Sequence, residues 1–439
     1  MRNRQNTMSL KYRHRLGFVR PFGNMDNDLK SQIRKFTIIF VIAAAIFYTA
    51  FRFSGIPSEV GTLYYRYAES MLDMQMPYID FAAEYPPFAM VLILIPGLFS
   101  FSSFSYQIAF GLEAYVFLLI GLVCVHRIAG TFSDEPKRFS DLYIILSICL
   151  FDFVMDRYDI FPTIMCLAAL YFIRFDRMEW AWAMMALGTV TKLYPALMAP
   201  VLLIYLCMNG RKRDALKGVG ICLVIGSLSM LPFIISDPGS AFIFLTYHMD
   251  RGMQVEALAS SFLMLFGNLG LIDVRYVFNF GSDNIYGPVP DAVAGCMLYL
   301  MFITIMFTYV AYWYILRKRD RRDSYPMFTA ACLAVIMLFM LVNKVLSSQY
   351  LVWMIPFVVV MAMFLKPEWK NRTVWMFGIS IALTQINLIV NYALRPVGEP
   401  FTLPGILLIM VRNIILVLLF VIVVRTVSGS GDLVPDGEV

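Results

Sequence analysis

Long apolar segments, separated by short polar stretches, recur along almost the whole chain of 439 residues. They are continuously apolar rather than alternating, and many approach the roughly 20 residues that a helix needs to cross a bilayer. They lie at 36–53, 86–101, 105–127, 141–155, 159–175, 179–190, 194–209, 216–235, 291–316, 325–342, 350–365, 373–391 and 404–425. A shorter segment at 257–272 has the length of a re-entrant segment. The pattern predicts an all-α polytopic membrane protein with about 11–13 transmembrane helices.

The composition agrees with this class. Hydrophobic residues make up 60% of the chain and charged residues 15%, whereas soluble domains carry roughly 25% charged residues. The net charge is +6, but the basic residues lie in short loops, which argues against a nucleic-acid partner and for a topological signal. The seven cysteines include no CxxC pair and the three histidines are scattered. The sequence therefore predicts no disulfide and no metal site.

Basic residues set the expected orientation in the membrane. They gather in the polar tail 1–35 and in three short clusters, at 211–217, 317–322 and 366–372. The positive-inside rule places all of them in the cytoplasm. We therefore expect a cytoplasmic N-terminal tail, a transmembrane domain at 36–425 and a flexible cytoplasmic tail at 426–439, in the plasma membrane.

The same rule places the loop 54–86 outside the cell. Between Tyr64 and Gln75 this loop has an apolar stripe and a charged stripe at helical spacing, which predicts an interfacial helix. Seven apolar segments lie between the basic tail and the basic cluster at 211–217. Seven crossings would put these two basic regions on opposite sides of the membrane, although both are expected in the cytoplasm. Either one short segment does not cross the membrane or two merge; the candidates are 86–101, 141–155 and 179–190.

The end of this loop, Pro77–Pro87, carries the most informative residues of the chain. Asp80 and Glu84 are four residues apart, so on a helix they would share one face. Tyr78 and Tyr85 lie beside them. Two acids among aromatic residues at a membrane surface predict an active site.

Further charged residues interrupt apolar segments on the predicted outer face. They are Asp156-Arg157-Tyr158-Asp159, Lys192, the loop His248 to Glu256, Lys344 and Arg395. A charge at the centre of a membrane helix costs roughly 2.5–3.5 kcal/mol on insertion scales, so such residues usually pair or line a polar cavity. Each has a simpler explanation: Arg157 could pair with Asp156 or Asp159, and Lys192 could extend to the interface. Their convergence on one face favours a site.

Glycosyl transfer from a lipid-linked sugar phosphate fits this set of residues. The leaving group is a phosphate, which needs cations rather than a general acid. One carboxylate can take the proton from the acceptor hydroxyl. The apolar segments provide a groove for a polyprenyl chain.

Five motifs in order resemble glycosyltransferase family 87 of the GT-C superfamily. They are PYxDFxxEYPP (77–87), RYD (157–159), TKLYP (191–195), YHxDRGxQxE (247–256) and KVLSxQYLxW (344–353). The resemblance implies a GT-C fold whose first extracytoplasmic loop carries the catalytic acid. It also implies inverting transfer, on the outer face, from a polyprenyl-phosphate sugar to a lipid-linked or cell-envelope glycan. Mannose is the commonest donor sugar of such enzymes, and no cofactor or divalent metal is indicated.

One departure from the family concerns the catalytic acid. Relatives often carry an aspartate at the start of the first loop helix, in a pattern like DxxxY. An alignment on Tyr65 puts Gly61 at that position. We therefore expect Asp80 to be the base, with Glu84 second and Glu59 third, or else a divergent and inactive member.

The resemblance also suggests roles for the other motif residues. The candidates for binding the donor phosphate are Arg251, Lys344, Lys192 and Arg157. The candidates for binding the sugar or the acceptor are Tyr78, Tyr85, Asp159, His248, Gln254, Glu256, Gln349 and Tyr350.

Two other functions fit the composition. A transporter or flippase of a lipid-linked or polar solute should have pseudo-symmetric halves with interrupted helices in matching positions. The second half of the chain has no repeat of the block 77–87, which disfavours this alternative. A non-catalytic scaffold for envelope assembly is the third candidate, if the loss of the acid at position 61 is decisive.

Overall fold

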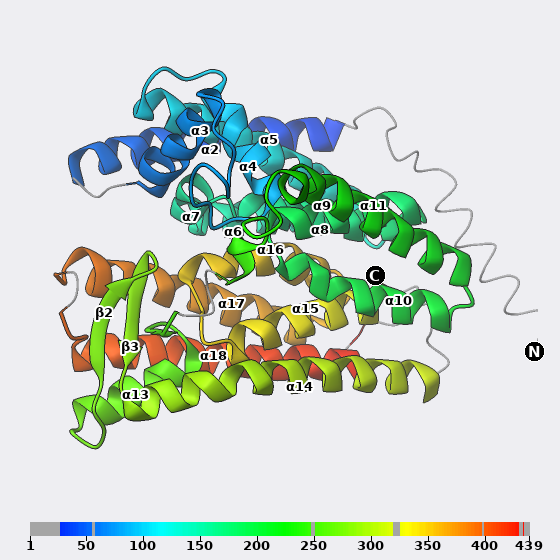
Figure 1. Ribbon diagram of the computed structural model, residues 1–439. Helices are drawn as coiled ribbons and strands as arrows, with labels where there is room; N and C mark the ends of the chain where they lie inside the picture. The colour runs from blue at the N-terminus through cyan, green and yellow to red at the C-terminus, as the bar shows by residue number, and fades with distance from the viewer. Residues whose placement is uncertain are drawn as a thin grey trace, which may run out of the picture.

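The computed structural model describes residues 27–54, 58–246, 251–318, 325–396, 399–429 and 433. Helices of the N-terminal half form one layer, and helices of the C-terminal half form a second (Figure 1). The first layer contains α2 (Asn27–Ser54), α3 (Tyr65–Leu72), α4 (Pro87–Gly97), α5 (Ser103–Ala129), α6 (Pro136–Cys149), α7 (Phe151–Asp156), α8 (Ile160–Arg174), α9 (Met178–Thr191) and α11 (Lys212–Ser236). The second contains α13 (Leu258–Asn268), α14 (Pro288–Lys318), α15 (Tyr325–Val342), α17 (Pro367–Asn387) and α18 (Leu403–Val427).

Shorter elements connect the layers. Helices α10 (Met198–Met208) and α16 (Leu351–Ala362) contact helices of both layers. The remaining elements are α12 (Ile243–Thr246), the π-helices η1 (Val60–Tyr64) and η4 (Leu388–Ala393), and the 3₁₀-helices η2 (Tyr194–Leu197) and η3 (Ser348–Tyr350).

The predicted helical membrane class is confirmed. Each predicted apolar segment forms helix, including 257–272, which contains α13. Among the described residues, seven helices are long and apolar enough to cross a membrane, and five further apolar helices have 10–17 residues. The segment 141–155 is divided at Leu150 between α6 and α7, so one of the three candidates for a non-crossing segment is a broken helix. A helix, α3, forms where the interfacial helix was predicted; its place at the membrane surface stays a prediction.

The prediction that Asp80 and Glu84 share a helix face was wrong. No helix forms between Asp73 and Pro86. Tyr78 has a positive φ of 70° and donates its backbone N–H to the carbonyl of Phe81 at 2.9 Å, which closes a tight turn. Prolines follow Met76 and Tyr85 and disfavour helical backbone at both, so the stretch between them is too short to nucleate a helix alone.

A small antiparallel sheet was not predicted. It consists of β1 (Met253–Gln254), β2 (Arg275–Asn279) and β3 (Ser282–Tyr286) in the order β1-β3-β2. Strands β2 and β3 form a hairpin (275–286), in which Asn279 pairs with Ser282. The two turn residues, Phe280 and Gly281, have φ of 50° and 67°. Positive φ at both central residues suits the right-handed twist of a two-residue hairpin.

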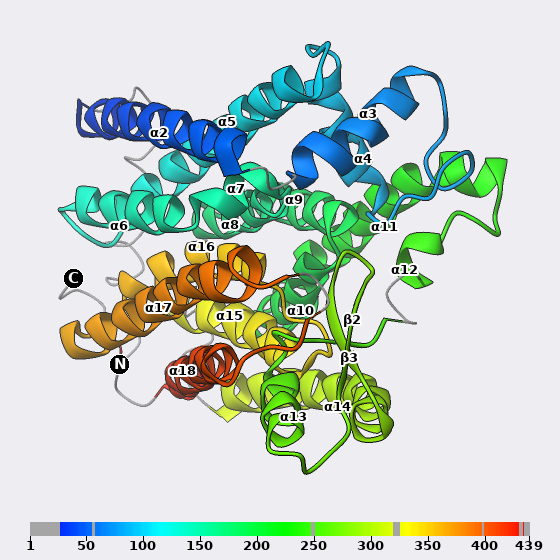
Figure 2. The same ribbon diagram turned by 90° about the vertical axis from the view of Figure 1, so that its left-hand side faces the viewer.

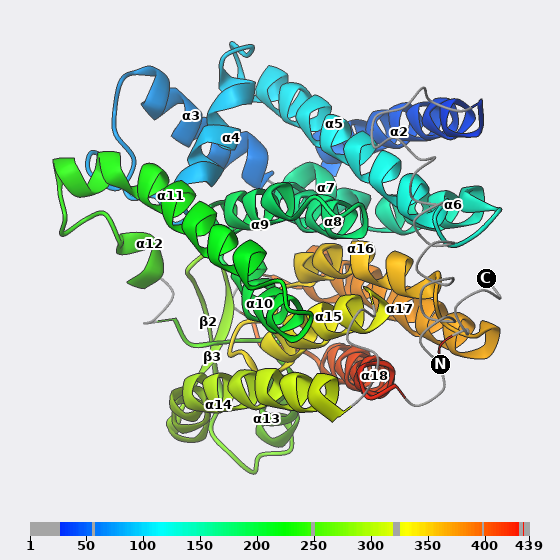
Figure 3. The same cartoon turned by 90° about the vertical axis from the view of Figure 1, so that its right-hand side faces the viewer.

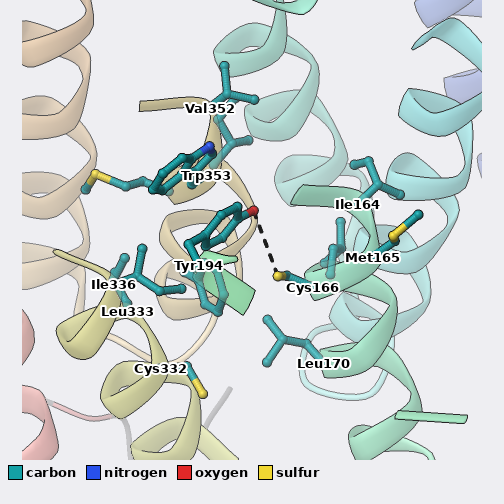
Figure 4. Close-up of a cluster of buried hydrophobic side chains, with 14 of the residues drawn as sticks. Ile164, Met165, Cys166, Leu170, Tyr194, Cys332, Leu333, Ile336, Val352 and Trp353 are labelled. Carbon is teal, nitrogen blue, oxygen red and sulfur yellow. Dashed lines mark hydrogen bonds between the residues drawn. The ribbon is translucent and has the colours of Figure 1, made fainter. Parts of the chain in front are cut away.

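The buried core is continuous between the layers. Figure 4 shows Tyr194 between helices α8 and α15, with its hydroxyl directed toward Cys166 and its ring beside Trp353. The Tyr194 and Trp353 rings are stacked with centroids 4.0 Å apart. Both residues also line the cavity described below, so the aromatic core forms part of the cavity wall.

Helices α9 and α11 approach closely at a glycine, and a larger residue there should destabilise the protein. A Cβ added to Gly218 would overlap the indole ring of Trp182, which is 1% exposed. We expect Gly218→Ala to cost about 1–3 kcal/mol through overpacking. Gly220→Ala in the same helix is the matched control, because no atom lies within 4 Å of the added Cβ. Thermal unfolding in detergent measures the difference; equal melting temperatures for the two variants would contradict this packing.

Candidate active site

A cavity of about 1080 Å³ lies between the two layers. Its wall contains the first loop, the break between α7 and α8, the segments before α13 and α16, and the hairpin. Figures 2 and 3 show α12 and the hairpin toward one side of the molecule, opposite α6. The volume is at the upper end of the range of small-molecule sites, so it can hold more than one sugar ring.

One wall of the cavity carries a carboxylate, Glu59, held by three residues. Its Oε1 accepts hydrogen bonds from the hydroxyls of Tyr85 at 2.8 Å and Tyr64 at 3.1 Å. Its Oε2 lies 3.0 Å from Nη1 of Arg157. Burial, and then the neighbouring Glu59 carboxylate, raise the pKa of Tyr85 well above its usual value. The hydroxyl therefore remains a donor, and the orientation of Glu59 is fixed.

Arg157 lies between two carboxylates. Its Nη1 is also 3.0 Å from Oδ2 of Asp156, so the expected pair with Asp156 exists and the pair with Asp159 does not. Asp156 accepts further hydrogen bonds from the Ser58 hydroxyl and from the backbone N–H of Val60. Burial raises the pKa of Asp156, whereas Arg157 lowers it. Arg157 thereby connects the first loop to the break between α7 and α8.

Lys192 is held by Asp159 and three aromatic rings. Its Nζ lies 2.7 Å from Oδ1 of Asp159, which also accepts a hydrogen bond from Nε1 of Trp353 at 2.6 Å. The same ammonium lies 4.6 Å from the Tyr158 ring centroid, 5.3 Å from that of Trp353 and 5.6 Å from that of Tyr350. Lys192 lines the cavity, whereas Asp159 is buried behind it.

Two more cations, Arg251 and Lys344, line the cavity close to each other. Nζ of Lys344 donates to the backbone carbonyl of Arg251 at 2.6 Å, and the N–H of Gln254 donates to the carbonyl of Lys344 at 3.0 Å. Ser347 donates from its hydroxyl to Oε1 of Gln254 at 3.0 Å. Two segments about ninety residues apart in the sequence therefore place Arg251 and Lys344 side by side.

Glu256 also reaches the cavity, but its carboxylate is occupied by protein groups. It accepts hydrogen bonds from Ser348 at 2.6 Å and Tyr392 at 2.8 Å, and pairs with Arg412 at 2.5 Å. Arg412, on α18, is 1% exposed and was not among the predicted site residues. As a charged residue inside the apolar segment 404–425, it could have been found from the sequence, since such residues usually pair or serve function.

The structure places most predicted site residues on this cavity. Those that line it are Glu84, Tyr85, Arg157, Lys192, Arg251, Gln254, Glu256, Lys344, Gln349 and Tyr350. Asp80 lies outside the cavity wall; it is exposed and accepts a hydrogen bond from the N–H of Met76 at 2.6 Å. Tyr78 is buried against Phe233 and Phe244. His248 lies outside the described residues.

Position 61 does not face the cavity. A Cβ on Gly61 would overlap the side-chain amide of Gln107 on α5, so a carboxylate there would be directed away from the site. Gly61 lies in the π-helix η1, in which the N–H of Tyr65 reaches the carbonyl of Val60. Hydrogen bonds between residues five apart place those residues on one face. This is why Glu59, five residues before Tyr64, contacts the Tyr64 hydroxyl.

A metal site is not evident in the part of the chain that the structure describes. No three His, Cys, Asp or Glu side chains there are arranged to hold a metal ion. The sequence-based expectation that the reaction needs no divalent metal stays a prediction.

Comparison with known proteins connects this cavity to a family. A model of glycosyltransferase family 87 matches residues 83–343, more than half of the chain. Proteins of curated function give no significant match. Among solved structures, ArnT from Cupriavidus metallidurans bound to undecaprenyl phosphate has a TM-score of 0.47 and 13% identity, over 90% of this chain and 77% of that chain. Its apo state has a TM-score of 0.46 and 14% identity, over 90% and 78%.

Proposed function

Since this chain belongs to glycosyltransferase family 87, we propose that it transfers mannose from a polyprenyl-phosphate donor to a hydroxyl of a lipid-linked or cell-envelope glycan. Transfer inverts the anomeric carbon and occurs on the extracytoplasmic face. One observation carries the proposal: a single cavity is lined both by a fixed carboxylate, Glu59, and by the cations Arg251 and Lys344.

We assign the general base to Glu59. A base must reach the acceptor hydroxyl inside the cavity, and Glu59 lines it whereas Asp80 does not. Tyr64, Tyr85 and Arg157 hold the carboxylate in place before substrate binds, which lowers the cost of reaching the reactive geometry. Glu84, which also lines the cavity, is the second candidate. Asp80 is the favoured base only if the turn that it closes opens in the complex.

We assign the donor phosphate to Arg251 and Lys344. When the sugar leaves, negative charge grows on the phosphate, and preorganised cations stabilise that charge. Lys192, which lines the same cavity and pairs with Asp159, is the third candidate. Three other residues of the cavity lining are candidates for contacting the sugar hydroxyls: Gln254, Gln349 and Tyr350.

The polyprenyl chain is proposed to leave the cavity along α12 and α14. The apolar part of the lining there is formed by Phe244, Leu245, Met297, Leu298 and Met301. Leu298 is 57% exposed on the outer surface of α14, so the lining continues onto a surface that lipid would cover. Because the prenyl chain would reach this lining from lipid and not from water, its contribution to binding is van der Waals packing.

The extracytoplasmic assignment rests on the two ends of the membrane-crossing helices. Helix α14 begins after the cavity-lining hairpin and ends at Arg317 and Lys318. Helix α2 has basic residues near its first turns and ends before Glu59. The positive-inside rule assigns the basic ends to the cytoplasm, and with them the two tails.

The test is transfer of radiolabel by the purified protein in lipid nanodiscs. Donors are polyprenyl-phosphate mannose, glucose and arabinofuranose, with a native lipid extract as acceptor. We expect label to move from the mannosyl donor only, and NMR of the product to show the opposite anomeric configuration. Transfer from another sugar alone would reject mannose, and no transfer from any of them would reject the lipid-phosphate donor.

A further inference from the structure

The hairpin 275–286 has no place in the sequence motifs, yet it holds the side chain of one proposed phosphate-binding residue. Arg251 is 8% exposed. Its Nε donates to Oδ1 of Asn284 at 3.2 Å, and its Nη2 donates to the hydroxyl of Ser282. Both acceptors lie on β3, so the guanidinium is oriented by the hairpin.

The amide of Asn284 is itself oriented by its neighbours. Its Nδ2 donates to the carbonyl of Asn279 at 2.9 Å, to Oδ1 of Asn279 at 2.7 Å and to the carbonyl of Ser282 at 3.1 Å. The Ser282 hydroxyl, also 3.1 Å away, is a fourth acceptor beside Nδ2. These acceptors leave Oδ1 as the group that faces Arg251, since an amide has donors on one side and an acceptor on the other. Asn284 is fully buried, so water does not replace these contacts.

The backbone beside Arg251 is fixed by the same hairpin. The N–H of Gly252 donates to the hydroxyl of Tyr286 at 3.1 Å, and Nδ2 of Asn279 donates to the same hydroxyl at 2.8 Å. A Cβ at position 252 would overlap the Tyr286 ring, which explains the glycine. The hydrogen bonds therefore form a closed network that runs from Arg251 through Asn284, Asn279 and Tyr286 to Gly252, which is bonded to Arg251 along the chain.

The hairpin is anchored to the C-terminal layer. Asp283 forms an ion pair with Arg395, with side chains 3% and 7% exposed. The Arg395 guanidinium lies 4.2 Å from the ring centroid of Phe401, and the N–H of Val255 donates to the carbonyl of Asp283 at 3.2 Å. The hydrogen-bond network that orients Arg251 is therefore anchored through Asp283 and Arg395, which lie outside the sequence motifs.

We propose that Asn284 is a positioning residue that aims Arg251 at the phosphate of a polyprenyl-phosphate ligand. The inference rests on the proposed function for the identity of the phosphate ligand, but not for the sugar or the acceptor. Asn284 acts through Arg251 and does not touch the reacting atoms.

The test is binding of farnesyl phosphate, with farnesol as the uncharged reference, to the purified full chain. We expect Asn284→Ala to weaken binding of farnesyl phosphate about tenfold, the value of one hydrogen bond to a charged group. Arg251→Ala should weaken it at least as much. In the Arg251→Ala background, Asn284→Ala should have no further effect, because the residue that it orients is gone. Asn284→Asp should bind more weakly than Asn284→Ala, since a carboxylate would neutralise Arg251.

The matched control is Val277→Ala, on the strand position paired directly with Asn284. Val277 is 40% exposed and does not line the cavity, so binding should be unchanged. The inference would be overturned if Val277→Ala lowered the affinity for farnesyl phosphate as much as Asn284→Ala. It would also be overturned if the double variant lost affinity by the product of the factors measured for Asn284→Ala and Arg251→Ala. Equal affinity of the wild type for farnesol would overturn it as well. Binding that behaves as expected without mannosyl transfer would reject the proposed mannosyl transfer and leave the positioning role of Asn284 standing.

Discussion

Glu59→Gln is expected to lower the turnover number of sugar transfer by about a hundredfold to ten-thousandfold, which is the contribution of a positioned general base. The amide keeps an oxygen for the hydroxyls of Tyr64 and Tyr85 but cannot take the acceptor proton. The KM for the donor should change little, because the donor phosphate is assigned to Arg251 and Lys344 and not to Glu59. Initial rates with the labelled donor, at saturating acceptor, measure the effect.

Two variants are matched to this prediction. Asp80→Asn removes a carboxylate outside the cavity wall and should retain most of the activity; Glu84→Gln removes the other first-loop carboxylate on the cavity wall. Full turnover in Glu59→Gln, together with a loss in Asp80→Asn, would move the base to the turn 77–81. A loss in Glu84→Gln alone would move it to Glu84.

Arg412→Ala is expected to destabilise the protein by about 3–5 kcal/mol, because it leaves the buried Glu256 carboxylate without the opposite charge of its partner. Arg412 donates to the carboxylate of Glu256 at 2.5 Å and to its backbone carbonyl at 2.9 Å. Both side chains are almost fully buried. The pair attaches α18 to the segment that carries Arg251 and Gln254, so its loss should loosen that wall of the cavity. Denaturant unfolding in detergent measures the change in free energy.

An exposed pair provides the control for Arg412. Lys35 and Asp141 lie 2.7 Å apart with side chains 47% and 31% exposed. Lys35→Ala should cost less than about 1 kcal/mol, because solvent screens exposed pairs. If Arg412→Ala cost no more than Lys35→Ala, Glu256 would have to be neutral or solvated in the folded protein.

The family and the enzyme class were accessible from the sequence. The family model confirms glycosyltransferase family 87 and hence a membrane enzyme that uses a polyprenyl-phosphate sugar. The helices were accessible for a physical reason: hydropathy adds up locally, so a segment such as 325–342 predicts α15 without knowledge of its neighbours. The cations were found because a charge within or between membrane segments is costly and therefore conspicuous.

Only the tertiary structure decided where these residues lie relative to the cavity. Asp80 and the cavity residue Glu59 are both first-loop acids, and the sequence analysis ranked Asp80 first because it lies in the motif 77–87, four residues before Glu84. The π-helix η1 changes the α-helical repeat by one residue, and prolines break the helix that would have joined Asp80 to Glu84. The hairpin 275–286 is short, and the contacts that give it a role come from Arg251 and Arg395, which are distant in sequence. Local patterns therefore determined the class and the elements, whereas long-range contacts decided which acid and which cation face the cavity.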